Sequence, residues 1–189
     1  MATDTRQVGE FHKADARRRR LFSLGRAAVV CALILGGATL AGLCRPTAPA
    51  QAGELAATAM TPSLWPVQGT VTSGFGWRTS PFGEGNEQHA GVDIAVSLGT
   101  PVVATADGEV VESGPVGDYG NMVQVDHGNG LATVYGHNSR LAVTAGQTVL
   151  KGQVIAYAGS TGKSTGPHVH YEVRKDGVAV DPWRFLVAY

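Results

Sequence analysis

The 189-residue chain has only two cysteines, Cys31 and Cys44, and both lie near its N-terminus. From Gly53 onward the sequence contains no cysteine at all. This absence excludes disulfides, cysteine nucleophiles and cysteine-ligated zinc sites from the C-terminal part of the chain. A metal bound there would have to take its ligands from histidine and carboxylate side chains.

Two familiar sequence motifs are also missing. The stretch "STGKST" ends like a P-loop, but Walker A needs a glycine five residues before Gly162, and that position is Tyr157. Gly166-Pro167 then follows where a P-loop would begin a helix. The metalloprotease motif H-E-x-x-H is absent. A zinc peptidase with this sequence would therefore need another source for its general base.

Charge is distributed unevenly along the chain. Before Gly53 there are eight basic and three acidic residues, and from Gly53 onward there are seven basic and twelve acidic residues. The C-terminal part therefore carries a net charge of −5. An acidic domain argues against a nucleic-acid partner.

The basic N-terminal part has the composition of an export segment. "RRRRLFSLGR" precedes the uncharged apolar stretch "AAVVCALILGGATLAGLC", and "APAQA" then offers cleavage sites of A-x-A type. The length of the apolar stretch is compatible with a cleaved signal peptide or with a retained membrane anchor, which would be the only membrane contact. We expect export to the periplasm, cell envelope or extracellular space, with residues 1–52 as the export segment, 53–63 as a linker and 64–189 as the functional domain.

Short β-type runs punctuated by Gly, Asn, Asp or Pro fill the sequence after Leu64, without amphipathic helical periodicity. This pattern predicts a single all-β domain, an antiparallel sheet or sandwich-like fold. Strands are expected at residues 70–73, 91–96, 101–105, 108–113, 122–126, 131–135, 154–157 and 169–174. A long glycine-rich loop is expected at residues 73–88, and Asp181-Pro182 predicts one helical turn near the end.

The stretch "GPHVHYEV" places two histidines on one predicted strand. Successive strand side chains point to opposite faces, so His168, His170 and Glu172 share a face, each roughly 6.5–7 Å from the next. Two imidazoles on one face can approach the same ion or the same substrate. The strand pattern alone does not assign a role to either histidine.

Three further histidines lie near glycine-rich strand ends. "HAGVD" places His89 and Asp93 four residues apart, "YGH" ends a predicted strand at His137, and "DHGNG" has His127 in a turn. A catalytic zinc site has three protein ligands and an open position. A His/Asp pair and one histidine of the H-x-H strand would meet that count. An isolated histidine is usually an ordinary polar residue, but five in one domain favour a common site.

Taken in order, H-x-x-x-D, Y-x-H and H-x-H resemble the motifs of the lysostaphin-type (LytM-like) zinc metallopeptidases. The flanking stretches "SGFGWR", "GTPVVATADGEVV", "VDHGNGLATVYGH" and "DPWRFL" are similar to that family as well. The resemblance extends from about Trp65 to Leu186. It implies a groove in an antiparallel β-sheet, one zinc ion, and peptide cross-links of bacterial peptidoglycan as the substrate. The export segment agrees independently with such a substrate.

The resemblance also implies a role for each of five residues. It implies that His89, Asp93 and His170 bind zinc and that His137 and His168 act on the water and the substrate. Which of the last two is the base and which is the acid stays open. Because all five match, we expect a zinc-dependent endopeptidase. The alternative is a non-catalytic module of the same fold that binds the cell wall or activates other hydrolases.

His127 is expected to be structural. The remaining candidates admit two interpretations each. Glu172 is expected either to fix an imidazole from outside the metal site or to lie at a solvated rim. Tyr135 is expected either to aid the transition state or to pack in the core. Arg78 and Asn86 are expected either to contact substrate or to belong to a surface loop.

Overall fold

The computed structural model describes residues 58–187, so the predicted export segment and the first part of the predicted linker lie outside the described residues. Among the described residues, none forms a helix with the length and hydropathy needed to cross a membrane. Residues 58–187 contain thirteen strands and two 3₁₀ turns, joined by turns and loops. They are β1 Thr70–Ser73, β2 Gly76–Thr79, β3 Asn86–His89, β4 Val92–Ala95, β5 Pro101–Val103, β6 Gly108–Val116, η1 Gly117–Tyr119, β7 Gly120–Asp126, β8 Leu131–Asn138, β9 Arg140–Leu141, β10 Thr148–Val149, β11 Val154–Tyr157, β12 His168–Lys175, β13 Val178–Val180 and η2 Pro182–Arg184.

The predicted all-β antiparallel fold is confirmed. Strands β1 and β11 have the expected bounds, and six others overlap the predicted ranges. The single turn η2 also forms as predicted, because the Asp181 side chain accepts a hydrogen bond from the Trp183 backbone N–H. The prediction of a loop at residues 73–88 was wrong, since this segment contains the β2–β3 hairpin. Its strands, "GWRT" and "NEQH", are short and mostly polar, so they carry no apolar alternation.

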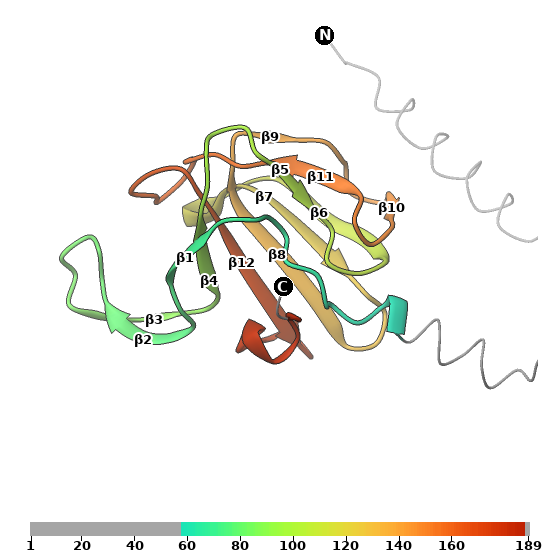
Figure 1. Ribbon diagram of the computed structural model, residues 1–189, viewed down its shortest axis with the longest axis horizontal. Helices are drawn as coiled ribbons and strands as arrows, with labels where there is room; N and C mark the ends of the chain where they lie inside the picture. Colours follow the sequence, from blue (N-terminus) through green and yellow to red (C-terminus); the bar gives the residue numbers. More distant parts are fainter. Residues whose placement is uncertain (1–57, 188–189) are drawn as a thin grey trace, which may run out of the picture. The chain divides into compact units, whose positions relative to one another are not determined.

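The strands form three antiparallel sheets. The main sheet has the order β1-β4-β12-β8-β7-β6-β10, with β13 also paired to β12. A smaller sheet has the order β5-β11-β9, and the β2–β3 hairpin forms a two-stranded sheet of its own. Figure 1 shows this hairpin projecting from the body of the domain near β1 and β4. The central position of β12, between β4 and β8, brings the "GPHVHYEV" strand to the middle of the main sheet.

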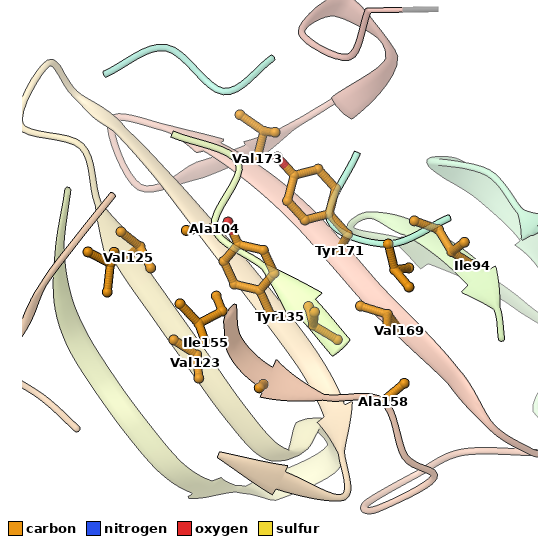
Figure 2. Packing of buried hydrophobic residues seen from close by; sticks show 14 of the residues in the cluster. Ile94, Ala104, Val123, Val125, Tyr135, Ile155, Ala158, Val169, Tyr171 and Val173 are labelled. Atoms are coloured by element: carbon orange, nitrogen blue, oxygen red, sulfur yellow. The ribbon is translucent and has the colours of Figure 1, made fainter. Parts of the chain in front are cut away.

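One hydrophobic core lies between the main sheet and the smaller sheet (Figure 2). Strand β12 contributes Val169, Tyr171 and Val173, all fully buried. The rings of Tyr171 and Tyr135 lie 5.5 Å apart, and both hydroxyls bond the Thr105 hydroxyl, at 3.0 and 3.1 Å. Each buried apolar side chain contributes about 1.5–3 kcal/mol. A one-residue slip of β12 would expose this set, so the core fixes which residues face the other way.

Gly91, just before β4, lets the backbone pass close to β12. A Cβ atom at Gly91 would lie 2.3 Å from the carbonyl oxygen of Tyr171, so no larger residue fits without moving a strand. With glycine there, β4 pairs with β12 so that Asp93 is directly opposite His170. The glycine of "HAGVD" therefore positions the aspartate.

Candidate metal centre

Five residues singled out in the sequence converge on one side of the main sheet, opposite the core. His168 and His170 come from β12, and Asp93 comes from β4. His89 is the last residue of β3, and His137 lies near the end of β8. The alternation predicted for β12 holds: its histidines face this site, while Val169 and Tyr171 belong to the core.

Three buried donor atoms meet at the centre of this group. His170 Nδ1 lies 2.9 Å from Asp93 Oδ1 and 3.0 Å from His89 Nε2. His89 Nε2 lies 3.2 Å from Asp93 Oδ1. The geometry of these three residues is compatible with a metal ion.

Hydrogen bonds on the far side of each imidazole determine which ring nitrogen carries the proton. His89 Nδ1 lies 2.8 Å from the Gly74 carbonyl oxygen, which can only accept, so Nδ1 is the donor. His170 Nε2 donates to Glu172 Oε1 at 3.0 Å. Neutral imidazoles in these tautomers direct a lone pair from His89 Nε2 and His170 Nδ1 towards Asp93 Oδ1. Three electron-pair donors so close together repel one another unless a proton or a metal ion lies between them, and a His₂Asp set of this kind could hold a metal ion.

The electrostatics of the group lead to the same conclusion. Burial alone would raise the pKa of Asp93 and lower that of His170. The hydrogen bonds and charges that join these residues outweigh burial, so the pKa of Asp93 falls below its usual range and the pKa of His170 rises. Without a metal, one proton on His170 Nδ1 supplies the positive charge that the donors need. A metal ion would replace that proton.

Glu172 holds His170 from behind. Its side chain is fully buried, and its carboxylate accepts hydrogen bonds from His170 Nε2 at 3.0 Å, Tyr119 Oη at 2.7 Å and Arg174 Nε at 2.7 Å. Burial would raise the pKa of Glu172, but these hydrogen bonds lower it, so the carboxylate stays ionised. Of the two interpretations offered for Glu172, the solvated rim position was wrong and the imidazole partner is present. No sequence pattern had indicated Tyr119, which lies in η1.

His137 and His168 form a second pair beside the three donors. Their rings lie 4.6 Å apart, and His168 Nε2 is 3.6 Å from Asp93 Oδ1. His137 Nδ1 donates to the Thr161 carbonyl oxygen and His168 Nδ1 to the Gly166 carbonyl oxygen, each at 2.8 Å. Each Nε2 is therefore left without a proton when the ring is neutral. Burial lowers the pKa of His137 to about 4, so this imidazole is neutral near pH 7.

The backbone turns His137 towards the site. Tyr135 faces the core, and regular strand alternation would direct His137, two residues later, to the core as well. His137 instead has φ 61°, in the left-handed region, and its ring contacts that of His168. This conformation costs a non-glycine residue about 1–3 kcal/mol and is concentrated at functional sites. The orientation of this imidazole therefore comes at the expense of some folding stability.

A cleft of about 240 Å³ lies over the group. Pro81 and Phe82 of the β2–β3 hairpin line one side, and Lys163 and Ser164 of the β11–β12 loop line another. A second cavity of about 430 Å³ extends towards β1. The two cavities share lining residues, Arg78, Pro81, Asp93, Thr165 and His168. They adjoin at the donor group, so an extended ligand could lie across it.

Arg78 and Asn86 differ from each other in the structure. The Arg78 guanidinium is paired with Asp93 Oδ2 and Glu87 Oε1, both at 2.8 Å, so it is a partner of the donor group. It also lines both cavities, and its contact with substrate stays a prediction. Asn86 begins β3 and is exposed, which agrees with the surface interpretation.

His127 and Tyr135 lie outside the site. His127 is buried, with Nδ1 donating to the Asp107 carbonyl oxygen at 2.7 Å and Nε2 bonded to Thr133 Oγ1 at 2.9 Å. Both ring nitrogens are used, which agrees with the structural role expected. The hydroxyl of Tyr135 is occupied in the core, which supports the packing interpretation.

The five residues of the candidate site lie in a part of the chain that is similar to known proteins. The family model of Peptidase family M23 matches residues 87–182, about half of the chain. Over 112 residues the chain is 46% identical to the DD-carboxypeptidase/endopeptidase Mpg of Neisseria meningitidis, a match that covers 59% of this chain and 26% of Mpg. Over 123 residues it is 41% identical to the murein hydrolase activator NlpD of Salmonella dublin, covering 65% of this chain and 30% of NlpD. The chain thus spans less than a third of the length of either relative.

The fold also has a solved counterpart. The catalytic domain of the antimicrobial peptidase lysostaphin from Staphylococcus simulans superposes with a TM-score of 0.56 at 33% sequence identity. The superposition covers 61% of this chain and 90% of the lysostaphin domain. The described β-domain therefore corresponds to nearly the whole of that catalytic domain.

Proposed function

Because the chain belongs to peptidase family M23, we propose that it is a zinc-dependent endopeptidase that hydrolyses peptide cross-links of bacterial peptidoglycan. The family is the one that the three histidine motifs predicted. The observation that carries the proposal is the convergence of His89 Nε2, His170 Nδ1 and Asp93 Oδ1, with two more imidazoles beside them at the same cleft. A purely structural cluster would not need five such groups around one cleft.

In this proposal His89, Asp93 and His170 hold the zinc ion. When bound, zinc acts as a Lewis acid that polarises the scissile carbonyl and lowers the pKa of water towards ~7. Glu172 keeps His170 in the tautomer whose Nδ1 lone pair faces the metal. The hydrogen bond from His89 Nδ1 to Gly74 does the same for His89.

His137 and His168 are the proposed acid–base groups. Both have Nδ1 tied to a backbone carbonyl, so Nε2 is the atom that exchanges protons. One neutral imidazole takes a proton from the attacking water, and one protonated imidazole delivers a proton to the leaving amine. Burial lowers the pKa of His137 to about 4, so the neutral form that can accept a proton predominates near pH 7. His168 lies within reach of the same space, 3.6 Å from Asp93 Oδ1.

We propose the same division of the chain that its composition indicates. Residues 1–52 export the protein, either as a signal peptide or as a membrane anchor, and residues 53–63 form a linker. Residues 64–189 form the zinc peptidase domain, which works in the cell envelope or outside the cell. The end of the linker lies against the domain, because the Ala59 carbonyl accepts a hydrogen bond from Asp107 N at 2.9 Å.

The similarity to NlpD supports a second candidate, a non-catalytic module that activates another hydrolase. The two candidates make different demands on the histidines. An activator has no need for a complete set of metal donors or for a strained His137 directed at them. The complete set in this chain favours the peptidase.

The experiment that separates them is digestion of purified peptidoglycan by the full-length protein, with zinc content measured on the same preparation. The peptidase should release cleaved cross-links, lose this activity with a chelator and regain it with added zinc. A protein that releases no products alone, yet accelerates an added peptidoglycan hydrolase, would be the activator.

A further inference from the structure

The three donor residues come from two separate sheets. His89 ends β3 of the hairpin, whereas Asp93 and His170 lie on adjacent strands of the main sheet. The hairpin's ladder does not continue into the main sheet. The hairpin is tied to the main sheet by the short connections from β1 to β2 and from β3 to β4. Side-chain contacts between the hairpin and the main sheet fix its orientation further.

Arg78 makes such contacts. It lies on β2, opposite Glu87 of β3, and its Nε donates to Glu87 Oε1 at 2.8 Å. Its Nη1 reaches the main sheet, where it donates to Asp93 Oδ2 at 2.8 Å and to the hydroxyl of Ser73. The side chain is 24% exposed, and that of Asp93 is 12% exposed. This ion pair is thus largely shielded from solvent, unlike an ordinary surface pair.

The two oxygens of Asp93 consequently have different partners. Oδ1 faces His89 and His170, while Oδ2 is occupied by Arg78. We infer that Arg78 is a positioning residue for the metal centre: it presents Asp93 through Oδ1 alone and fastens the hairpin that carries His89 to the main sheet. This inference rests on the proposed metal site.

The direction of the effect distinguishes positioning from simple electrostatics. A guanidinium beside a divalent cation repels it, so if charge were its only influence, removal of Arg78 would tighten zinc binding. If Arg78 positions Asp93 and the hairpin, its removal weakens zinc binding instead. Loss of a partner that orients a ligand typically costs about 10–100-fold in metal affinity.

The test is the zinc dissociation constant of the full-length protein, measured by competition with a chromophoric chelator. Arg78→Ala should weaken zinc binding about 10–100-fold. Arg78→Lys should give an intermediate loss, because one ammonium group cannot reproduce the fork between Asp93 and Glu87. Lys163→Ala is the matched control, since Lys163 is a cation at the same cleft with its partner at Glu84. It should change zinc affinity by no more than about twofold.

A second measurement reports whether Asp93 would bind the metal through one carboxylate oxygen or through both. Cobalt(II) in place of zinc gives a visible spectrum that weakens when the coordination number rises. Arg78→Ala frees Oδ2, so its cobalt spectrum should be weaker than that of the wild type.

Unchanged or tighter zinc binding by Arg78→Ala would overturn the inference. If this variant does not fold, Arg78→Lys decides the question, and wild-type affinity in that variant would overturn it equally. A wild-type protein that binds no zinc would refute the proposed function itself, a result distinct from either of these.

Discussion

Replacing Glu172 with glutamine perturbs the metal centre while leaving all three proposed ligands in place. The carboxylate is fully buried and serves three donors, His170 Nε2, Tyr119 Oη and Arg174 Nε. Glutamine has the same shape but only one acceptor oxygen, and its NH₂ group must face one of these donors. Either Arg174 loses its partner, or His170 shifts its proton to Nδ1, the atom that would face the metal.

The cost follows from these alternatives. One buried donor left unpaired lowers the free energy of unfolding by about 1–3 kcal/mol. An imidazole that spends part of its time in the wrong tautomer or orientation should lose about 10–100-fold in zinc affinity. Tyr171→Phe is the matched control, because it removes one hydroxyl from the core face of the same strand. It should lower the free energy of unfolding by about 0.5–1.5 kcal/mol and leave zinc affinity unchanged.

Both quantities are measurable on the same preparations. Chemical denaturation with a chelator present gives the free energy of unfolding of the apoprotein, and chelator competition gives the zinc dissociation constant. Wild-type zinc affinity in Glu172→Gln would refute the view that this carboxylate orients His170. A loss of affinity in Tyr171→Phe as large as that in Glu172→Gln would show instead that the strand as a whole had shifted.

Four further outcomes are expected. Zinc affinity should rise with pH, because burial would lower the pKa of His170, but its hydrogen bonds to the Asp93 and Glu172 carboxylates outweigh burial and raise that pKa above 6.5. Zinc must then displace a proton whose occupancy falls as pH rises; calorimetry in buffers of different ionisation enthalpy measures that proton, and its absence at about pH 6 would contradict the assignment. His137→Gly should be more stable than His137→Ala by about 1 kcal/mol in denaturation, since φ 61° is strained for alanine and not for glycine; the reverse order would mean that the backbone is unstrained. His127→Ala should lose about 1–3 kcal/mol of stability with zinc content unchanged, because both of its ring nitrogens are bonded away from the site. Gly91→Ala should lose about 1–3 kcal/mol and also weaken zinc binding, since the added methyl group forces β4, with Asp93, away from β12; a stable variant with normal affinity would refute the close approach.

The all-β fold was predictable because its longer strands carry their own signals. In β12 the residues Val169, Tyr171 and Val173 alternate with His168 and His170, and that alternation alone gives the strand, its core face and its polar face. The short hairpin strands gave no such signal. Their residues are mostly polar, and the contacts that hold the hairpin in place involve residues of β1 and β4.

The candidate site shows the same difference between local sequence signals and contacts that cross the fold. Motif spacing identified the residues that converge, but it did not predict the orientation of His137, which depends on one left-handed φ angle that contradicts strand alternation. Arg78 and Tyr119 were not predicted as partners of Asp93 and Glu172, because their contacts cross between separate elements of the fold. Local pattern carries no information about which side chains meet across sheets.

The most direct test of the proposed function is zinc stoichiometry measured beside turnover of a cross-linked muropeptide, for the wild type, His170→Ala and His168→Ala. The wild type should bind one zinc ion per chain and cleave the substrate. His170→Ala should lose both zinc and activity, whereas His168→Ala should keep zinc and lose roughly 10²–10⁴ in rate. Zinc retained by His170→Ala and lost by His168→Ala, or a zinc-loaded wild type that cleaves nothing, would contradict the account.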